Sequence, residues 1–292
     1  MLNQPPHETL RLALQANKSS FLAVAAYSLF INIAMLVPAI YMLQVYDRVV
    51  VGASIPTLYT LTLLMIVFMV AMGILEWSRQ EIMRRVSNRL DLHMAPALFD
   101  LGYRQVRYSG GLLSGTQALK DLKGIRQFIA SNGLFAFFDA PWVPIYLLVM
   151  FAFHPWIGLA GLISAALLVA ITFLNERLTH EQAREADREY NETGRTLSQY
   201  LRNSEVMTAM GMLGNLRSRW LETSYGALLK QNAAAEISSR LMAVSKTLRI
   251  IIQSLILGLG AYLAIKQEIS PGMMIAGSIL LGRALAPIDQ ML

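Results

Sequence analysis

The sequence predicts an all-α integral membrane protein, the class in which helices cross a bilayer. Hydrophobic residues make up 55% of the chain and charged residues 15%, whereas a soluble domain carries about a quarter charged residues. The mean hydropathy is +0.45. Uncharged stretches about as long as a spanning helix, which needs roughly 20 residues, recur along the chain. The chain has no cysteine, which excludes disulfides, thiolate metal sites and cysteine catalysis.

Six transmembrane helices are predicted after a polar N-terminal segment, residues 1–20, and they make up one transmembrane domain, residues 21–292. No charge interrupts residues 19–46 or 49–75, and a short outer turn around Asp47, Arg48 and Gly52 is expected between them. The spans share a length suited to the hydrocarbon core and are placed at about residues 21–46, 54–76, 134–153, 156–175, 247–265 and 272–292.

The third and fourth spans are predicted to form a tight hairpin. Residues 140–175 carry no formal charge, and the sequence FHPWIG lies in their middle. Pro155 lacks an amide donor and disfavours a helical conformation at His154. The helix is therefore expected to end before His154 and to restart at the proline.

The basic residues predict the orientation. Of the 25 basic residues, only Arg48, Lys266 and Arg283 lie outside the N-terminal segment, the two long connections and the start of the fifth span. Lysine and arginine collect on the cytoplasmic side of membrane proteins, so both termini are expected in the cytoplasm. The net charge of +6 has the same cause. The charge is divided among several segments, and aromatic residues do not alternate with the basic ones, so no nucleic-acid partner is expected.

The two long connections, residues 77–133 and 176–246, are predicted to be cytoplasmic helical hairpins. Connections of this length are rarely structureless, and the second, fourth and fifth spans are expected to continue into them as helices. In the first, an apolar residue recurs every four positions at Ile82, Val86, Leu90 and Met94. In the second, opposite charges lie three apart and are interpreted as a solvated helix face; the pairs are Glu181/Arg184, Glu185/Arg188 and Glu192/Arg195.

Each hairpin is predicted to end in a short helix at its tip, near SGGLLSGTQALKDLKGIRQF in the first and near RNSEVMTAMGMLGN in the second. In the first tip, glycines break the helix and Thr116 is a plausible N-cap; the glycines are Gly110, Gly111 and Gly115. In the second, Asn203 or Ser204 could be the cap, and Gly211 and Gly214 are expected to end the helix. Such amphipathic helices suit docking onto a cytoplasmic partner; the alternative is that they only close the hairpins.

Three separated stretches carry a resemblance to a known family: ALKDLKGIRQFIASNGLFAFFDAPWVPIYLLVMFAFHPWIGLAG, EVMTAMGMLGNLRSRW and PGMMIAGSILLGRALAPIDQ. Together with six spans and two long inner hairpins, they resemble the transmembrane half of type I secretion ABC transporters, in the protease/lipase-exporter (PrtD-like) branch. The resemblance covers essentially the whole chain.

The resemblance implies a homodimer in the bacterial inner membrane. It implies export of unfolded proteins with an uncleaved C-terminal signal, through a periplasmic adaptor (membrane fusion protein) and a TolC-like outer-membrane channel. The two tips would be coupling helices, at about residues 114–121 and 203–210, that dock onto nucleotide-binding domains; the candidate residues are Thr116, Leu119, Asp121, Glu205, Val206, Met207 and Met210.

The 292 residues contain no nucleotide-binding domain. The phosphate loop G-x-x-x-x-G-K-[ST] does not occur, and the nearest text, GMMIAGS from Gly272, lies in a predicted span. No catalytic residue and no cofactor are therefore assigned to this chain, and ATP and Mg are expected on the absent domain. Either a fragment or a permease served by a separate ATPase fits, and the family's usual fusion favours a fragment. The alternative functions are an ABC exporter of lipid or peptide and a membrane scaffold without ATPase activity.

Polar residues inside the spans are the candidate translocation-pathway residues: Arg283, Asn32, Gln44 and Gln253. An intramembrane arginine costs roughly 2.5–3.5 kcal/mol on insertion scales and usually faces protein or a wet cavity. Snorkelling to the interface is the alternative for Arg283, and interhelical hydrogen bonding is the commoner use of the amides.

Other residues are assigned structural roles. Pro287 and Pro38 are hinge candidates, with a static bend equally possible. Asp139 is expected to partner a nearby arginine or to cap a helix. Small residues at Gly158, Gly161 and Ala165 predict close helix packing. The four histidines lie in different segments without a metal-ligand spacing, so no metal site is predicted.

Overall fold

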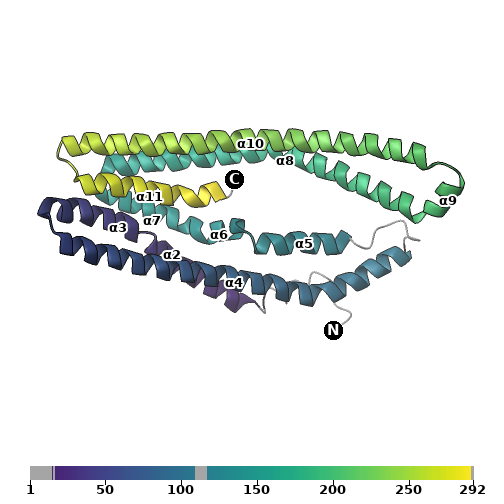
Figure 1. The fold of residues 1–292 in the computed structure, drawn as a ribbon, viewed down its shortest axis with the longest axis horizontal. Coiled ribbons are helices and arrows are strands. Elements are labelled where there is room, and N and C mark those ends of the chain that lie inside the picture. The colour runs from purple at the N-terminus through teal and green to yellow at the C-terminus, as the bar shows by residue number, and fades with distance from the viewer. Residues whose placement is uncertain (1–14, 16, 109–116, 291–292) are drawn as a thin grey trace. The chain divides into compact units, whose positions relative to one another are not determined.

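The computed structural model describes residues 15, 17–108 and 117–290, and every regular element in them is a helix (Figure 1). Six helical stretches are long and apolar enough to cross a membrane. These findings confirm the predicted all-α membrane fold. The six stretches are Lys18–Val50, Ile55–Tyr108, Gly133–Phe153, Pro155–Arg202, Leu213–Ile265 and Pro271–Gln290.

The chain divides into two compact units, which are described separately. The first unit comprises residues 1–165 and 251–291, and the second comprises residues 166–250. The first unit contains the first three spanning stretches, the sixth, and the adjoining ends of the fourth and fifth.

The first span is not one regular α-helix. It consists of α2 (Lys18–Ala34), α3 (Val37–Gln44) and the π-helical turn η1 (Val45–Val50). The break precedes Pro38, which lies in the first turn of α3, where its missing amide removes no intrahelical bond. The chain reverses at Ala53, whose φ is 46°. The turn predicted around Asp47, Arg48 and Gly52 was therefore placed a few residues too early, because the π-helical turn continues the helix through Asp47 and Arg48.

Three helices run from spans into the long connections, as predicted. They are α4 (Ile55–Tyr108), α8 (Pro155–Arg202) and α10 (Leu213–Ile265), of 54, 48 and 53 residues. At about 1.5 Å rise per residue, each is more than twice as long as the roughly 30 Å hydrocarbon core is thick. The short helix α9 (Ser204–Ala209) lies between α8 and α10.

The third span is broken near its start. The first unit continues from α5 (Gln117–Ile129) to α6 (Asn132–Asp139), the 3₁₀ turn η2 (Ala140–Trp142) and α7 (Val143–Phe153). Pro141 lies in η2 and Pro144 lies in the first turn of α7, consistent with the bonds that proline cannot make.

The hairpin between the third and fourth spans follows the prediction. His154 is extended, with φ −164° and ψ 140°, and α8 begins at Pro155. The two helices pack closely because Gly158 lies against the Phe151 ring and Gly161 lies against Met150. The predicted small-residue packing is thereby confirmed for both glycines.

The final helix, α11 (Pro271–Gln290), packs against α3 and α7 within the first unit (Figure 1). It follows the α10–α11 turn, in which Gln267 has a φ of 62°. Its buried face is apolar along its length and comprises Gly272, Ala276, Gly277, Leu280, Leu281, Ala284, Leu285, Pro287 and Ile288.

A hydrophobic cluster joins α5 to the part of α4 that continues beyond the predicted span. Val86, Leu90 and Met94 are buried in it, and Ile82 packs against it, which confirms the predicted four-residue apolar spacing. From α5, Leu122 and Ile129 complete the contact.

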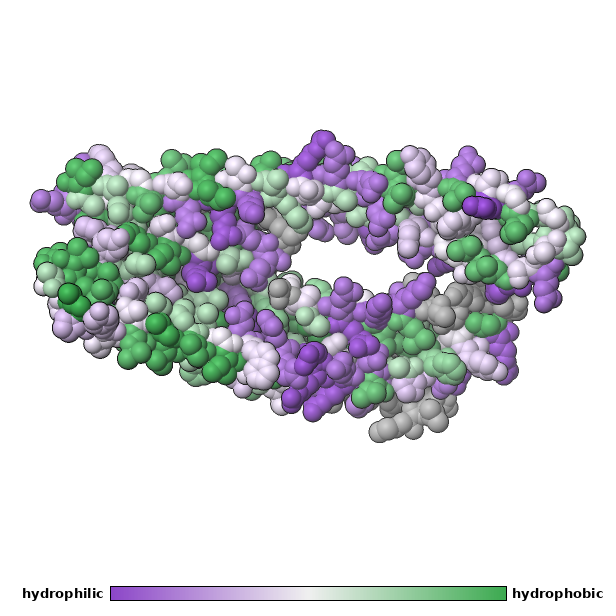
Figure 2. Space-filling view, viewed as in Figure 1, coloured by the Kyte–Doolittle hydropathy of each residue, from purple (hydrophilic) through white to green (hydrophobic). Residues whose placement is uncertain are grey.

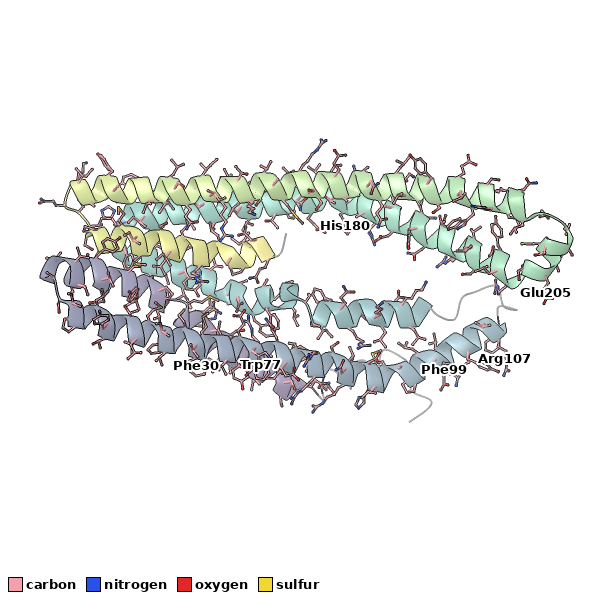
Figure 3. All side chains as sticks on the ribbon, viewed as in Figure 1. Phe30, Trp77, Phe99, Arg107, His180 and Glu205 are labelled. Carbon is pink, nitrogen blue, oxygen red and sulfur yellow. The ribbon has the colours of Figure 1, made fainter. Side chains whose placement is uncertain are left out.

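The exposed side of α4 changes from hydrophobic to hydrophilic along its length. Figure 2 shows hydrophobic side chains over the spanning parts of α3 and α4, and hydrophilic ones farther along α4. In a soluble protein such a continuous apolar surface would be a liability, but it suits lipid. Trp77, 68% exposed, stands where the apolar stretch ends (Figure 3), as aromatic residues at membrane interfaces do.

In the second unit, charged side chains link α8 to α10. Lys230 of α10 forms ion pairs with Glu185, at 3.0 Å, and with Glu189. Glu192 pairs with Arg188, four residues earlier. The charged residues spaced three apart along α8 are exposed, which confirms the predicted solvated helix face, and the neighbouring helix adds the Lys230 cation.

Candidate functional site

A buried polar cluster lies inside the first unit, at the break in the third span. Arg79 of α4 forms an ion pair with Asp139, its Nη1 lying 3.1 Å from Oδ1 and 3.2 Å from Oδ2. The two side chains are only 5% and 10% exposed. Arg79 Nη1 also donates to Ser28 Oγ at 2.9 Å. Asp139 therefore has the arginine partner that its sequence context predicted.

Asn32 connects this ion pair to two further helices. Its Nδ2 donates to Asp139 Oδ1 and to the backbone oxygen of Ser28, both at 2.8 Å. The Tyr146 hydroxyl of α7 donates toward the backbone oxygen and Oδ1 of Asn32, at 3.0 and 2.9 Å. The amide of Asn32 is thus engaged in interhelical hydrogen bonds. Its proposed contact with a transported polypeptide stays a prediction.

The environment of Arg79 is apolar apart from these partners. Its guanidinium carbon lies 4.4 Å from the centroid of the Phe135 ring, a distance suited to a cation–π interaction. Its Nε is buried and has no hydrogen-bond partner among the described residues. Breaking a buried ion pair is costly because it leaves an uncompensated charge, so the cluster holds α2, α4, α6 and α7 together.

Arg283 lies half-buried in α11, beside the buried Ala284 and Leu285. Whether it lines a pathway stays a prediction.

The remaining pathway and hinge candidates occupy different positions. Gln253 of α10 reaches α11, because its Nε2 would lie 3.6 Å from a Cβ placed on Gly282. Gln44 is half-buried at the end of α3. Pro38 follows the break in the first span, whereas Pro287 is buried in α11, which continues to Gln290. Their functional roles stay predictions.

The second predicted tip is the six-residue helix α9. Glu205 lies in its first turn (Figure 3), and Val206 and Met210 are exposed, while Met207 is half-buried. The helix is followed by Gly211, whose φ is +66°, a conformation that glycine adopts without strain.

Two details of this tip differ from the prediction. Asn203 precedes α9 but makes no side-chain cap bond, because its Nδ2 donates back to the Gln199 carbonyl at 3.2 Å. Gly214 does not end a helix, since it lies in the first turn of α10.

The first predicted tip is only partly within the described residues. Thr116 and the three glycines before it lie outside them. Of the remaining candidates, Leu119 packs against the α4–α5 cluster and Asp121 is exposed. Leu119 is therefore at least partly a packing residue.

Sequence reasoning missed Arg79, Ser28 and Tyr146 as members of the buried cluster. Arg79 was taken only as one of many basic residues of the first long connection. A signal was available, because Ser28 and Tyr146 are polar groups within uncharged spans, where interhelical bonds are expected. Among the described residues, no group of three or more His, Asp or Glu side chains could hold a metal ion.

Comparison with known proteins places this arrangement in a family. Residues 21–285 match the family model described as the ABC transporter transmembrane region. The type I secretion system ATP-binding protein PrsD of Rhizobium meliloti is 34% identical over 280 residues, which are 95% of this chain and 48% of that relative.

More distant relatives include two toxin-translocation proteins. The alpha-hemolysin translocation ATP-binding protein HlyB of Escherichia coli is 27% identical over 281 residues, and the leukotoxin translocation ATP-binding protein LktB of Mannheimia haemolytica is 24% identical over 283. Each alignment covers 92% of this chain and 38% of the relative. The chain thus spans about half, or less, of the length of these relatives. With its six candidate spans, the chain is a multi-pass membrane protein that belongs to the ABC transporter transmembrane region family.

Proposed function

We propose that this chain is the permease part of an ATP-driven ABC exporter for type I protein secretion. The observation that carries the proposal is the 34% identity to PrsD over 95% of the chain. The type I secretion name belongs to that relative, and the two toxin-translocation relatives point to the same kind of cargo.

The proposal assigns separate tasks to the parts of the exporter. The spans provide a path through the inner membrane, with both termini in the cytoplasm as the basic residues indicate. ATP and Mg bind a nucleotide-binding domain that contacts α9 and the start of α5. Two copies form the permease, and a periplasmic adaptor and an outer-membrane channel carry the unfolded protein onward.

A deletion experiment in the source bacterium tests this function. The coding region is removed, and the proteins of the culture supernatant are compared by mass spectrometry with those of the parent and of a complemented strain. The expected result is the loss of one or a few proteins from the supernatant, their accumulation inside the cell, and their return on complementation.

Other outcomes would identify the competing functions. An unchanged supernatant proteome together with altered envelope lipid or external peptide would indicate a lipid or peptide exporter. Failure of a membrane complex to assemble, with all exported material unchanged, would indicate a scaffold. Either result would contradict the proposed role in protein secretion.

A further inference from the structure

The start of α11 is bonded to the end of the first span by a single carboxylate. Asp47 of η1 accepts a hydrogen bond from Ser270 Oγ at 2.6 Å and another from the Gly272 amide at 3.0 Å. Ser270 Oγ in turn accepts from the Met273 amide at 3.1 Å. A helix N-terminus has free amides and a partial positive charge, so a carboxylate from another span is well placed to stabilise it.

The backbones also approach closely at this point, and they require glycine. A Cβ placed on Gly272 would lie 2.7 Å from Asp47 Oδ1 and 2.7 Å from the Leu43 backbone oxygen. Both atoms belong to the end of the first span. Any other residue would push α11 away from it, so the contact is a specific fit as well as a pair of hydrogen bonds.

The same α10–α11 turn is bonded to the turn between α7 and α8. His154 Nε2 lies 3.3 Å from Glu268 Oε2. The Trp156 amide donates to His154 Nδ1 at 3.2 Å, which leaves Nε2 to carry the proton that faces the glutamate. The α10–α11 turn is therefore linked both to the end of the first span and to the turn between α7 and α8.

These contacts differ from the Arg79–Asp139 pair in what happens when they separate. Asp47 is half-buried, and the Glu268 side chain is 43% exposed, so water can replace the lost bonds. A hydrogen bond exchanged for water changes the free energy by only about 1 kcal/mol. Separating the buried pair would instead leave a charge unpaired in an apolar environment. Of these two sets of contacts, those of the α10–α11 turn are the ones suited to open and close reversibly.

We propose that the α10–α11 turn is a latch, and that Asp47 must release Ser270 and Gly272 during each transport cycle. The inference rests on the proposed function to this extent: a polypeptide can cross only if spans part at the end that carries the short connections. In this structure Asp47 holds the first and sixth spans together at that end. Release frees the start of α11 from the end of the first span.

Cross-linking the latch tests the proposal in the complete protein. The chain has no cysteine, so an Asp47→Cys/Ser270→Cys variant can form only the intended disulfide within it. Oxidation is expected to abolish secretion and reduction to restore it, while each single variant responds to neither treatment. Failure of the disulfide to form in resting membranes would overturn the proposed contact, and secretion at the parental rate by the oxidised protein would overturn the latch.

A matched control ties helices that need not separate. The Tyr41 hydroxyl of α3 lies 3.0 Å from Thr62 Oγ1 of α4, between the first and second spans. An oxidised Tyr41→Cys/Thr62→Cys variant is expected to secrete normally. Equal inhibition by both disulfides would show a general effect of oxidation and would contradict the latch.

A distance measurement tests the latch independently of which cargo the exporter transports. Spin labels are attached at Val51, which directly follows η1, and at Ile265, the last residue of α10; the two residues are 81% and 82% exposed. ATP with vanadate is expected to lengthen the label distance in the parent and not in the cross-linked protein. Lengthening without protein secretion would retain the latch and refute the proposed cargo, whereas an unchanged distance in a secreting protein would refute the latch alone.

Discussion

At the residue scale, the buried Asp139 carboxylate is the counter-ion of the buried Arg79 side chain. Replacing it with asparagine keeps its shape and leaves the Arg79 charge, only 5% exposed, without a counter-ion. We expect Asp139→Asn to lower the free energy of unfolding by about 3–5 kcal/mol, the usual cost of breaking a buried ion pair. Thermal unfolding of the purified protein in detergent measures the change.

Two further variants show whether the charge is the cause. Asp187→Asn removes an exposed carboxylate and should leave the unfolding temperature unchanged. Adding Arg79→Met to Asp139→Asn removes the unpaired cation and should recover much of the lost stability, since apolar replacements of buried pairs are often tolerated. A single Asp139→Asn variant as stable as the parent would refute the role of the cluster.

Arg283 allows a functional prediction at the same scale. If it faces the transported polypeptide, Arg283→Ala should insert and fold normally yet reduce secretion, whereas Arg283→Lys should retain most of it because the charge is kept. If it only snorkels to the interface, both variants should secrete at the parental rate. Quantifying secreted protein per inserted transporter separates the two, and normal secretion by Arg283→Ala would end the pathway interpretation.

At the element scale, the attachment of α5 to α4 depends on a few apolar side chains. Leu90 is 2% exposed within their cluster, whereas Leu92, two residues later, is 74% exposed. We expect Leu90→Ala to destabilise this contact by about 2–5 kcal/mol, as truncation of a buried leucine does, and Leu92→Ala to have little effect. Hydrogen exchange at the α5 amides measures the difference, and equal protection in the two variants would contradict the prediction.

Local patterns predicted most of the elements but few of their contacts. The four-residue spacing from Ile82 to Met94 predicted an amphipathic helix because it depends only on helical periodicity, and Pro155 predicted the hairpin from its own chemistry. The partners of Asp139 and Asp47 lie 60 and 223 residues away. No sequence period connects such distant residues, because only the packing of the spans brings them together.

The same limit explains the charge pairs of the second unit. The charge spacing along α8 predicted a solvated face, but it carries no information about the facing helix. The ion pairs of Lys230 with the glutamates of α8 are therefore seen only in the structure. The same limit applies to the candidate site. The sequence showed that Asn32 is a polar residue within a span, but it did not show which residues bond to it.

At the scale of the whole molecule, the uneven distribution of basic residues predicts that the α8–α9–α10 tip and the α10–α11 turn lie on opposite sides of the membrane. A single cysteine at Glu205, on exposed α9, reports on the first, and one at Gln267 reports on the second. The cysteine-free background makes each label specific. A membrane-impermeant maleimide applied to spheroplasts should label Gln267→Cys at once and Glu205→Cys only after permeabilisation. The opposite labelling pattern would invert the topology, and it would place the proposed nucleotide-binding partner of α9 on a side without cytoplasmic ATP.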